Sequence, residues 1–191
     1  MKIGILALQG GYFEHQEILI RLGFETVLIK EVKDLKDIEG LVLGGGESTT
    51  IKKLISLPLK NALIKKIEKG LPTLATCAGL ILLAKEIEGE EPYLALLDIK
   101  VKRNAYGRQS NSFIKTAKIP KISENYLELE FIRAPIISKV YNNTIILLEL
   151  EGNIVAVQQG NILGLSFHPE LTNCLEIYEY FRKIINEAKL V

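Results

Sequence analysis

A single cysteine separates two apolar segments in the stretch Leu71-Pro72-Thr73-Leu74-Ala75-Thr76-Cys77-Ala78-Gly79-Leu80-Ile81-Leu82-Leu83-Ala84. The first segment predicts a short buried strand, and the second predicts an apolar helix that begins at once. A side chain on so sharp a turn points away from the backbone, and the free N–H groups at the helix start favour a thiolate. This is the geometry of a nucleophile elbow, with sulfur in place of a serine hydroxyl. The alternative is an inert buried cysteine, because the side chain packs like a small hydrophobe.

The first half of the sequence alternates apolar strand patterns with helical patterns. Strands are predicted at residues 3–8, 24–29, 41–43 and 71–76, and helices at residues 12–22, beyond an N-cap at Ser48 or Thr49, at 58–69 and from 78 onward. This alternation predicts an α/β fold with a mostly parallel central sheet and helices on both faces. Strand ends meet at one rim of such a sheet. Gln9-Gly10, the turn at residues 44–48 and Cys77 should therefore lie together.

The second half predicts additional strands, several of them antiparallel. The strand patterns cover residues 98–103, 112–117, 129–137, 145–150, 154–158 and 162–167, and a last helix covers about residues 172–188. Gly152-Asn153 and Gly160-Asn161 are typical of hairpin turns. No repeat, low-complexity segment or linker interrupts the sequence, so residues 1–191 are predicted to form one domain.

Composition excludes several classes of function. The 191 residues are 48% hydrophobic, and their formal net charge is +1. We therefore expect a globular core and neither a nucleic-acid partner nor a membrane partner, since no basic patch or bilayer-length apolar run is present. Cys77 and Cys174 lack metal-ligand spacing, so no metal site is expected. Reduced thiols predict a cytoplasmic protein.

A cysteine nucleophile needs a base, and the chain has two histidines, His15 and His168. His168 follows a predicted strand, so its imidazole can reach the rim where Cys77 lies. Glu170 stands two positions later and can hold the ring in one tautomer. The alternative is a surface histidine beside a surface glutamate. His15 lies between Glu14 and Glu17 and is interpreted as a solvated helix residue.

The glycine run Gly44-Gly45-Gly46 can adopt positive φ and bring backbone N–H groups close to a ligand. A carbonyl attacked by Cys77 develops negative charge on oxygen, and N–H groups of this turn and of Ala78 could stabilise that charge. A phosphate-binding loop fits poorly, because the Walker lysine and the dinucleotide spacing are missing. A tight turn without function remains an alternative.

Three segments together resemble the signatures of class I (triad-type) glutamine amidotransferases. They are Leu43-Gly44-Gly45-Gly46-Glu47-Ser48-Thr49-Thr50, Ala75-Thr76-Cys77-Ala78-Gly79-Leu80 and Ser166-Phe167-His168-Pro169-Glu170-Leu171. The chain is similar, more narrowly, to the glutaminase subunits of pyridoxal 5′-phosphate synthase. That match adds Ala7-Leu8-Gln9-Gly10, Glu14-His15, residues 103–109 and Phe131-Ile132-Arg133-Ala134-Pro135.

The resemblance implies a flavodoxin-like three-layer α/β sandwich that hydrolyses glutamine to glutamate and ammonia. By matching position, Cys77 is the nucleophile, His168 is the general base and then the acid, and Glu170 is the orienting carboxylate. Gly45, Gly46 and the Ala78 amide form the implied oxyanion hole. No cofactor is implied, because pyridoxal 5′-phosphate is the product of the complex.

The resemblance also implies a pocket for the substrate L-glutamine. Its matching residues are Gly46, Glu47, Ser48, Arg103, Ile132 and Arg133. A guanidinium fork suits the α-carboxylate of glutamine, and Glu47 could help to hold the α-ammonium group. Taken without the family, each arginine is more typical of a solvated or paired surface charge.

An obligate partner follows from the same resemblance. In the family, ammonia passes into a barrel-shaped synthase subunit within a large hetero-oligomer, and docking orders the oxyanion loop. Residues 44–46 are a candidate switch, because a peptide between glycines can flip at little cost. Gln9-Gly10 and the first helix, with His15, are candidates for the docking face.

Two rival functions stay open from the sequence. One is a glutaminase subunit that feeds a different synthase, against which the segments at residues 103–109 and 132–135 argue. The other is a non-enzymatic flavodoxin-like binding module with an inert cysteine, against which the set Cys77, His168 and Glu170 argues.

Overall fold

The computed structural model describes residues 1–105, 112–172 and 174–190. Residues 106–109, which carry part of the family resemblance, lie outside this set. The elements of the first half are β1 (Lys2–Leu6), α1 (Tyr12–Arg21), β2 (Glu25–Ile29), the short 3-10 helix η1 (Val32–Leu35), β3 (Gly40–Leu43), α2 (Ser48–Leu54), α3 (Leu57–Glu68), β4 (Thr73–Thr76) and α4 (Ala78–Leu83). Those of the second half are β5 (Ala84–Ile87), β6 (Leu97–Lys102), β7 (Ser112–Ile119), β8 (Ser123–Ile132), β9 (Ile136–Val140), β10 (Ile145–Leu150), β11 (Asn153–Gln159), β12 (Ile162–Leu165) and α5 (Leu175–Ala188).

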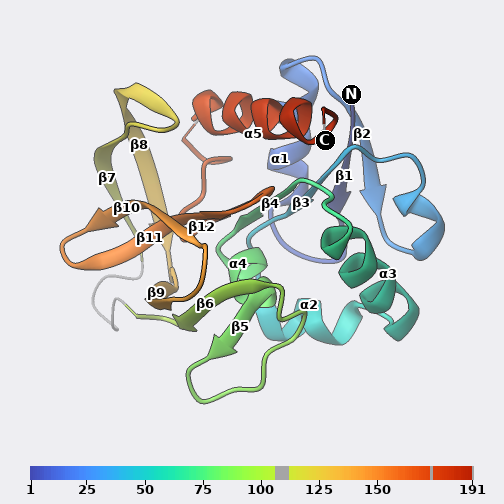
Figure 1. Cartoon of the computed structure of the whole chain (residues 1–191), viewed down its shortest axis with the longest axis horizontal. Helices are drawn as coiled ribbons and strands as arrows, with labels where there is room; N and C mark the ends of the chain where they lie inside the picture. The colour runs from blue at the N-terminus through green and yellow to red at the C-terminus, as the bar shows by residue number, and fades with distance from the viewer. Residues whose placement is uncertain (106–111, 173, 191) are drawn as a thin grey trace.

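The described strands form a ten-stranded central sheet and a separate two-stranded hairpin. The central order is β2-β1-β3-β4-β12-β11-β9-β6-β5, with β10 paired to β11, and β7 pairs only with β8 (Figure 1). The strands from β2 to β12 in this order are parallel, whereas β11 pairs antiparallel with β12, β9 and β10. The predicted α/β fold, with a mostly parallel sheet and added antiparallel strands, is confirmed.

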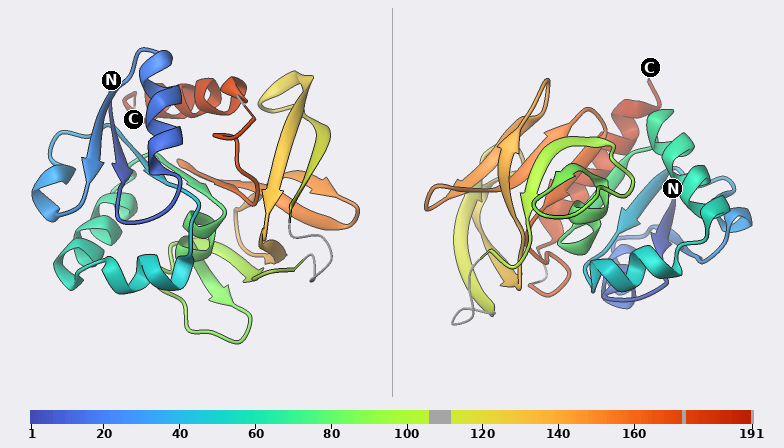
Figure 2. Two further views of the ribbon diagram at one scale, coloured as in Figure 1. Left: turned by 180° about the vertical axis from the view of Figure 1, so that it is seen from behind. Right: turned by 90° about the horizontal axis from the view of Figure 1, so that it is seen from below.

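Helices cover both faces of the parallel strands (Figure 2). Ile3, Ile5 and Val42 pack in one apolar cluster with residues of α1 and α5. Leu41 and Leu43 alternate with Val42 and pack in a second cluster with residues of α2, α3 and α4. Both faces of β3 are therefore buried, as its uninterrupted apolar sequence requires.

The single strand predicted at residues 129–137 is wrong, because the structure divides it into β8 and β9. Arg133 breaks the strand with a φ of +46°, and Pro135 lacks the N–H group that a strand ladder needs. The break sends β8 into the hairpin and β9 into the central sheet. It leaves Ile132 and Arg133 at the rim.

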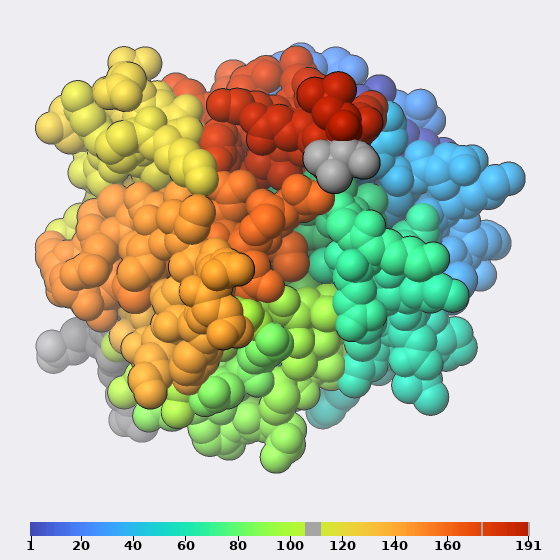
Figure 3. Space-filling view, viewed as in Figure 1, coloured from blue at the N-terminus to red at the C-terminus, as the bar shows by residue number. Residues whose placement is uncertain are grey.

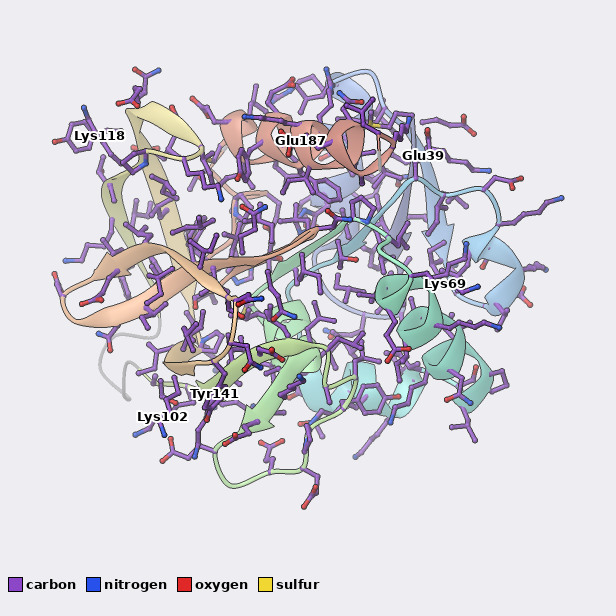
Figure 4. All side chains as sticks on the ribbon, viewed as in Figure 1. Glu39, Lys69, Lys102, Lys118, Tyr141 and Glu187 are labelled. Atoms are coloured by element: carbon purple, nitrogen blue, oxygen red, sulfur yellow. The ribbon has the colours of Figure 1, made fainter. Side chains whose placement is uncertain are left out.

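The two ends of the chain lie close together on the surface. The amino group of Met1 is 3.7 Å from Glu39 Oε2, and Lys189 forms an ion pair with Glu39 Oε1 (Figure 4 labels Glu39). Figure 3 shows α5 and the β7–β8 hairpin on the same face of the molecule. Among the described helices, none is long and apolar enough to cross a bilayer.

Candidate active site

Cys77 occupies a strained turn between β4 and α4. Its φ is +46° and its ψ is −101°, a conformation that is costly for a residue with a Cβ atom. The Cys77 N–H donates to Leu165 O on β12 at 2.9 Å, which ties the turn to the sheet. Gly79 permits the sharp entry into α4, because any Cβ at this position would overlap Leu43 O. The turn predicted from the sequence is therefore a nucleophile-elbow geometry.

The Cys77 side chain is almost completely buried, but it borders a cavity. Its Sγ atom is 3.9 Å from the carbonyl oxygen of Ile132, a weak thiol contact. Ile132 is the last residue of β8, so the break after this strand supplies one wall of the site.

The other free cysteine, Cys174, directly precedes α5, and burial raises the pKa of its thiol to about 12.

His168 follows β12 and is fixed from two sides. Its backbone N–H donates to Glu130 O on β8 at 2.8 Å, and its Nδ1 is 2.7 Å from Glu170 Oε1. Its Nε2 is buried and has no hydrogen-bond partner among the described residues. Burial disfavours the charged imidazole, but the interactions with Cys77 and Glu170 outweigh this effect and raise the pKa of His168 to about 10.

Glu170 is buried, and its carboxylate faces two histidines. Burial would raise the pKa of this carboxyl group, but His15 and His168 beside it lower the pKa overall. Glu170 is therefore ionised at neutral pH and can hold the His168 ring through Nδ1–H. The structure thus brings Cys77, His168 and Glu170, which come from distant parts of the sequence, to one rim.

The interpretation of His15 as a solvated helix residue is wrong, and so is its placement on the docking face, because its side chain is 0% exposed. Its Nδ1 is 2.8 Å from Tyr178 OH, and its Nε2 lies 3.3 Å from Thr76 Oγ1 and 3.4 Å from Glu170 Oε2. His15 shares the inner face of α1 with Ile18 and Leu19. The i, i+3, i+4 spacing of these three residues was the sequence signal for burial, and the flanking glutamates obscured it.

The glycine loop is tied to the turn between β1 and α1. Gly45 O accepts a hydrogen bond from the Gly11 N–H at 3.1 Å, and the Glu47 N–H donates to Gln9 Oε1 at 2.8 Å. The Cα atom of Gly45 lies against the His168 ring, since a Cβ there would overlap Cε1. The prediction that these turns share one rim with Cys77 is confirmed.

A cavity of about 460 Å³ opens at this rim. Every residue predicted to be catalytic, to bind glutamine or to form the oxyanion hole lines this cavity, except Ala78. The full lining is Gly11, Glu14, Gly45, Gly46, Glu47, Ser48, Cys77, Ile81, Arg103, Asn104, Ile132, Arg133, His168, Glu170 and Leu171. Ser48 adds a buried hydroxyl that has no partner among the described residues. The described residues contain no group of three or more His, Cys, Asp or Glu side chains arranged to hold a metal ion.

Glu47 is the N-cap residue of α2, so the N-cap predicted at Ser48 or Thr49 is wrong. Its carboxylate accepts from the Thr49 and Thr50 N–H groups at 3.2 and 2.7 Å. Burial opposes its ionisation, but the hydrogen bonds from Thr50 and Thr49 lower the pKa of Glu47 to about 2. A glutamate has the acceptor that an N-cap needs, but the side chain is longer than those usually found there.

Arg103 is held between two carboxylates at the edge of the cavity. Its guanidinium is 3.2 Å from Glu47 Oε1 and also pairs with Glu90. Sequence reasoning missed Glu90, because it lies in an acidic loop far from every motif. Arg133, at the break after β8, also lines the cavity. The two arginines predicted for substrate binding therefore border the same space as Cys77.

The family model for "SNO glutamine amidotransferase family" matches residues 5–187. The chain belongs to this family. This amidotransferase is 53% identical to the pyridoxal 5′-phosphate synthase subunit PdxT of Clostridium beijerinckii, over 96% of this chain and 97% of the relative. It is 49% identical to the PdxT subunit of Methanocorpusculum labreanum, over 97% of this chain and 98% of the relative.

Solved structures of glutamine amidotransferases have the same fold as this family member. A crystal structure described as a glutamine amidotransferase superposes with a TM-score of 0.90 at 39% identity, covering 96% of this chain and 98% of the other. A second glutamine amidotransferase, from Thermotoga maritima, superposes with a TM-score of 0.61 at 15% identity, covering 100% of this chain and 86% of the other. The second likeness concerns the fold alone.

Proposed function

We propose that the protein hydrolyses L-glutamine to L-glutamate and ammonia and supplies the ammonia to a pyridoxal 5′-phosphate synthase subunit. One observation carries the chemistry: Cys77 stands on a strained elbow beside a buried His168 whose Nε2 is unpartnered among the described residues. Both side chains border the same cavity. Family membership and PdxT relatives over nearly the full chain support the glutamine substrate and the synthase.

The first half of the reaction forms a thioester. In the proposed first step His168 takes the proton of the Cys77 thiol on Nε2, and the raised pKa of His168 keeps that proton on the ring at neutral pH. The thiolate attacks the amide carbon, and the carbonyl oxygen takes the negative charge. The N–H groups of Gly45, Gly46 and Ala78 are the proposed oxyanion hole. His168 then gives its proton to the amide nitrogen, and ammonia leaves as the C–N bond breaks.

The second half releases glutamate. Neutral His168 takes a proton from water, and the hydroxide attacks the thioester carbon. The C–S bond breaks, glutamate departs, and Cys77 regains the thiolate paired with protonated His168. Glu170 keeps Nδ1–H of the ring bonded through both halves, so Nε2 is the atom that gives and takes the proton.

Charged groups at the cavity edge are suited to the amino-acid end of glutamine. Arg103 and Arg133 are the proposed partners of the α-carboxylate, with the Ile132 backbone beside them. Glu47 already accepts three N–H or guanidinium donors and stays ionised, so it can add an electrostatic attraction for the α-ammonium group. The unpartnered Ser48 hydroxyl is a further polar contact.

The proposed assembly is a hetero-oligomer with the synthase subunit, in which residues 1–191 act as one amidotransferase domain. Pyridoxal 5′-phosphate is then the product of the complex, and this subunit needs no cofactor of its own. Both cysteines are free, which fits the reducing cytoplasm.

A glutaminase assay with and without a pyridoxal 5′-phosphate synthase subunit tests the proposal. Glutamate and ammonia should appear in equal amounts, faster with the synthase present, and the Cys77→Ala variant should lose at least about 1000-fold in kcat. An inactive wild-type complex, or full activity of Cys77→Ala, would refute it.

A further inference from the structure

Behind Glu170 lies a buried polar cluster that the proposed reaction does not use. His15 on α1, Thr76 on β4 and Tyr178 on α5 meet there, and each side chain is buried. Figure 2 shows α1 and α5 packed side by side on the same face of the sheet. Buried polar groups are costly unless they are bonded, so this cluster needs a physical reason.

The hydrogen bonds of the cluster fix the tautomer of His15. Burial raises the pKa of Tyr178 well above 10, so its hydroxyl keeps its proton, and the one partner the structure gives that hydroxyl is His15 Nδ1, 2.8 Å away. Tyr178 therefore donates and Nδ1 accepts. Burial also lowers the pKa of His15, so the ring is neutral and its single proton is on Nε2.

That proton faces the rear of the catalytic carboxylate. Nε2 of His15 lies 3.4 Å from Glu170 Oε2 and 3.3 Å from Thr76 Oγ1. Glu170 Oε1 is bonded to His168, whereas the buried Oε2 has no hydrogen-bond partner among the described residues. In the structure Nε2 is bonded to Thr76 Oγ1, so the same N–H must be shared between Thr76 and Glu170 Oε2 to complete the missing bond.

We propose that His15 is a positioning residue, which donates Nε2–H to Glu170 Oε2 and so fixes the carboxylate that orients His168. The inference rests on the proposed glutaminase function and deepens it. A carboxylate held through both oxygens cannot rotate away from His168, and its second oxygen is not left unpaired in a dry site.

A neutral His15 suits the position beside Glu170 better than a cationic one. The charged or titratable groups that face His15 are Glu170, His168, Glu14 and Tyr178. A cationic His15 would compete with protonated His168 for Glu170 and would lower the affinity of His168 for its proton. Tyr178 prevents this competition, because its hydroxyl donates a hydrogen bond to Nδ1 and so disfavours a proton on that atom. As a neutral residue, His15 stabilises the carboxylate through its N–H group.

Two variants of His15 separate a donor role from a packing role. The Nε2 amide of glutamine can reach the place of the imidazole Nε2, whereas the shorter asparagine reaches only the place of Nδ1. In the complex with the synthase, His15→Asn should lose about 10- to 100-fold in kcat, the effect of one hydrogen bond to a charged group, with KM for glutamine little changed. His15→Gln should remain within about threefold of wild type.

A second pair of variants tests the tautomer without removing the imidazole. Tyr178→Phe deletes the donor to Nδ1 and should lower kcat by about 3- to 10-fold, since one neutral hydrogen bond is lost. Tyr180→Phe is the matched control, because the Tyr180 hydroxyl lies on the same helix but bonds to Gln158 Oε1 at 2.7 Å. Its kcat should equal that of wild type.

Equal kcat values for His15→Asn and His15→Gln would overturn the inference. If His15→Asn does not fold, the comparison of Tyr178→Phe with Tyr180→Phe tests the inference instead. Equal kcat values for these two variants would overturn the inference. An inactive wild-type complex refutes the proposed glutaminase itself, so the two failures are distinguishable.

Discussion

The backbone N–H of Gly11 donates to the carbonyl oxygen of Gly45 at 3.1 Å. This bond joins the turn after β1 to the glycine loop, which is the candidate oxyanion loop. The carbonyl of the Gly45–Gly46 peptide therefore points at the turn, and the N–H of the same trans peptide points the opposite way. Any partner that moves the turn would also move this peptide. If the synthase docks at Gln9-Gly10, as the sequence predicts, this bond is a physical route from the docked turn to the candidate oxyanion loop.

Gly10→Ala should disturb this junction and lower the glutaminase rate. A methyl group at Gly10 would overlap Gly45 O, and Gly10 has a φ of +99°, so the glycine loop must shift. We expect kcat/KM, measured with the synthase present, to fall at least about 10-fold, since loss of one oxyanion donor typically costs about 10²–10³.

Gly23→Ala is the control for backbone strain alone. Gly23 has a φ of +81°, but a Cβ there meets no atom within 4 Å. Both variants should lose stability, and only Gly10→Ala should lose activity. Equal activity of the two variants would contradict the proposed link between the turn and the loop.

Arg103→Lys should weaken glutamine binding. Lysine keeps the charge but lacks the fork that binds both oxygens of a carboxylate. We expect KM for glutamine to rise about 10-fold or more, with kcat changed less than about threefold, in steady-state glutaminase assays. The adjacent Lys102, exposed in Figure 4, supplies the control Lys102→Ala, which should leave KM unchanged. An unchanged KM in Arg103→Lys would remove Arg103 from the substrate site.

Glu47 should stabilise the fold only above acidic pH. Its folded pKa is about 2, below the unfolded value of about 4.5, so the ionised form stabilises the native state. That stabilisation is complete above about pH 4.5 and is lost as the pH falls toward 2. Urea denaturation of wild type and Glu47→Gln should show a constant difference from about pH 7 to 5 that shrinks toward about pH 3. If the difference in unfolding free energy between wild type and Glu47→Gln does not change with pH, the ionised form of Glu47 is not what stabilises the start of α2.

Glu170→Gln should move the alkaline limb of the pH–rate profile. The carboxylate helps to raise the pKa of His168 to about 10, and ammonia release needs the protonated ring. Without this charge, burial is opposed by the interaction with Cys77 alone, so the His168 pKa is lower than in wild type. The fall of kcat/KM at high pH should therefore begin at a lower pH in the variant than in wild type. Coincident alkaline limbs would exclude this role for Glu170.

Periodicity was enough to predict the parallel half of the fold. The buried strands β1, β3 and β4 are short apolar runs that end at glycine or cysteine turns, so both their type and their shared rim follow from local sequence. The β8–β9 break did not follow in the same way. Pro135 is the one local sign of a break within residues 129–137, and the strand pattern does not show the positive φ of Arg133 that divides them.

The motif residues at the rim were predictable, but their supporting partners were not. Cys77, His168 and Glu170 lie at strand ends within recognisable segments. Glu90 and Tyr178 support the site from loops and helices whose sequence carries no motif. His15 was interpreted as solvated because charges flank it, although a helix places such neighbours on a different face. Contacts between elements distant in the sequence decide these roles.

The most direct measurement is covalent labelling of the two cysteines by a diazo-ketone analogue of glutamine in the complex with the synthase, located by mass spectrometry of tryptic peptides. Cys77 and Cys174 are both buried and free, so Cys174 is an internal control for reactivity that does not depend on the site. The account predicts one label, on the peptide of residues 70–85, which excess glutamine prevents and Cys77→Ala abolishes. Labelling of Cys174 instead, or labelling of Cys77 that glutamine does not slow, would contradict it.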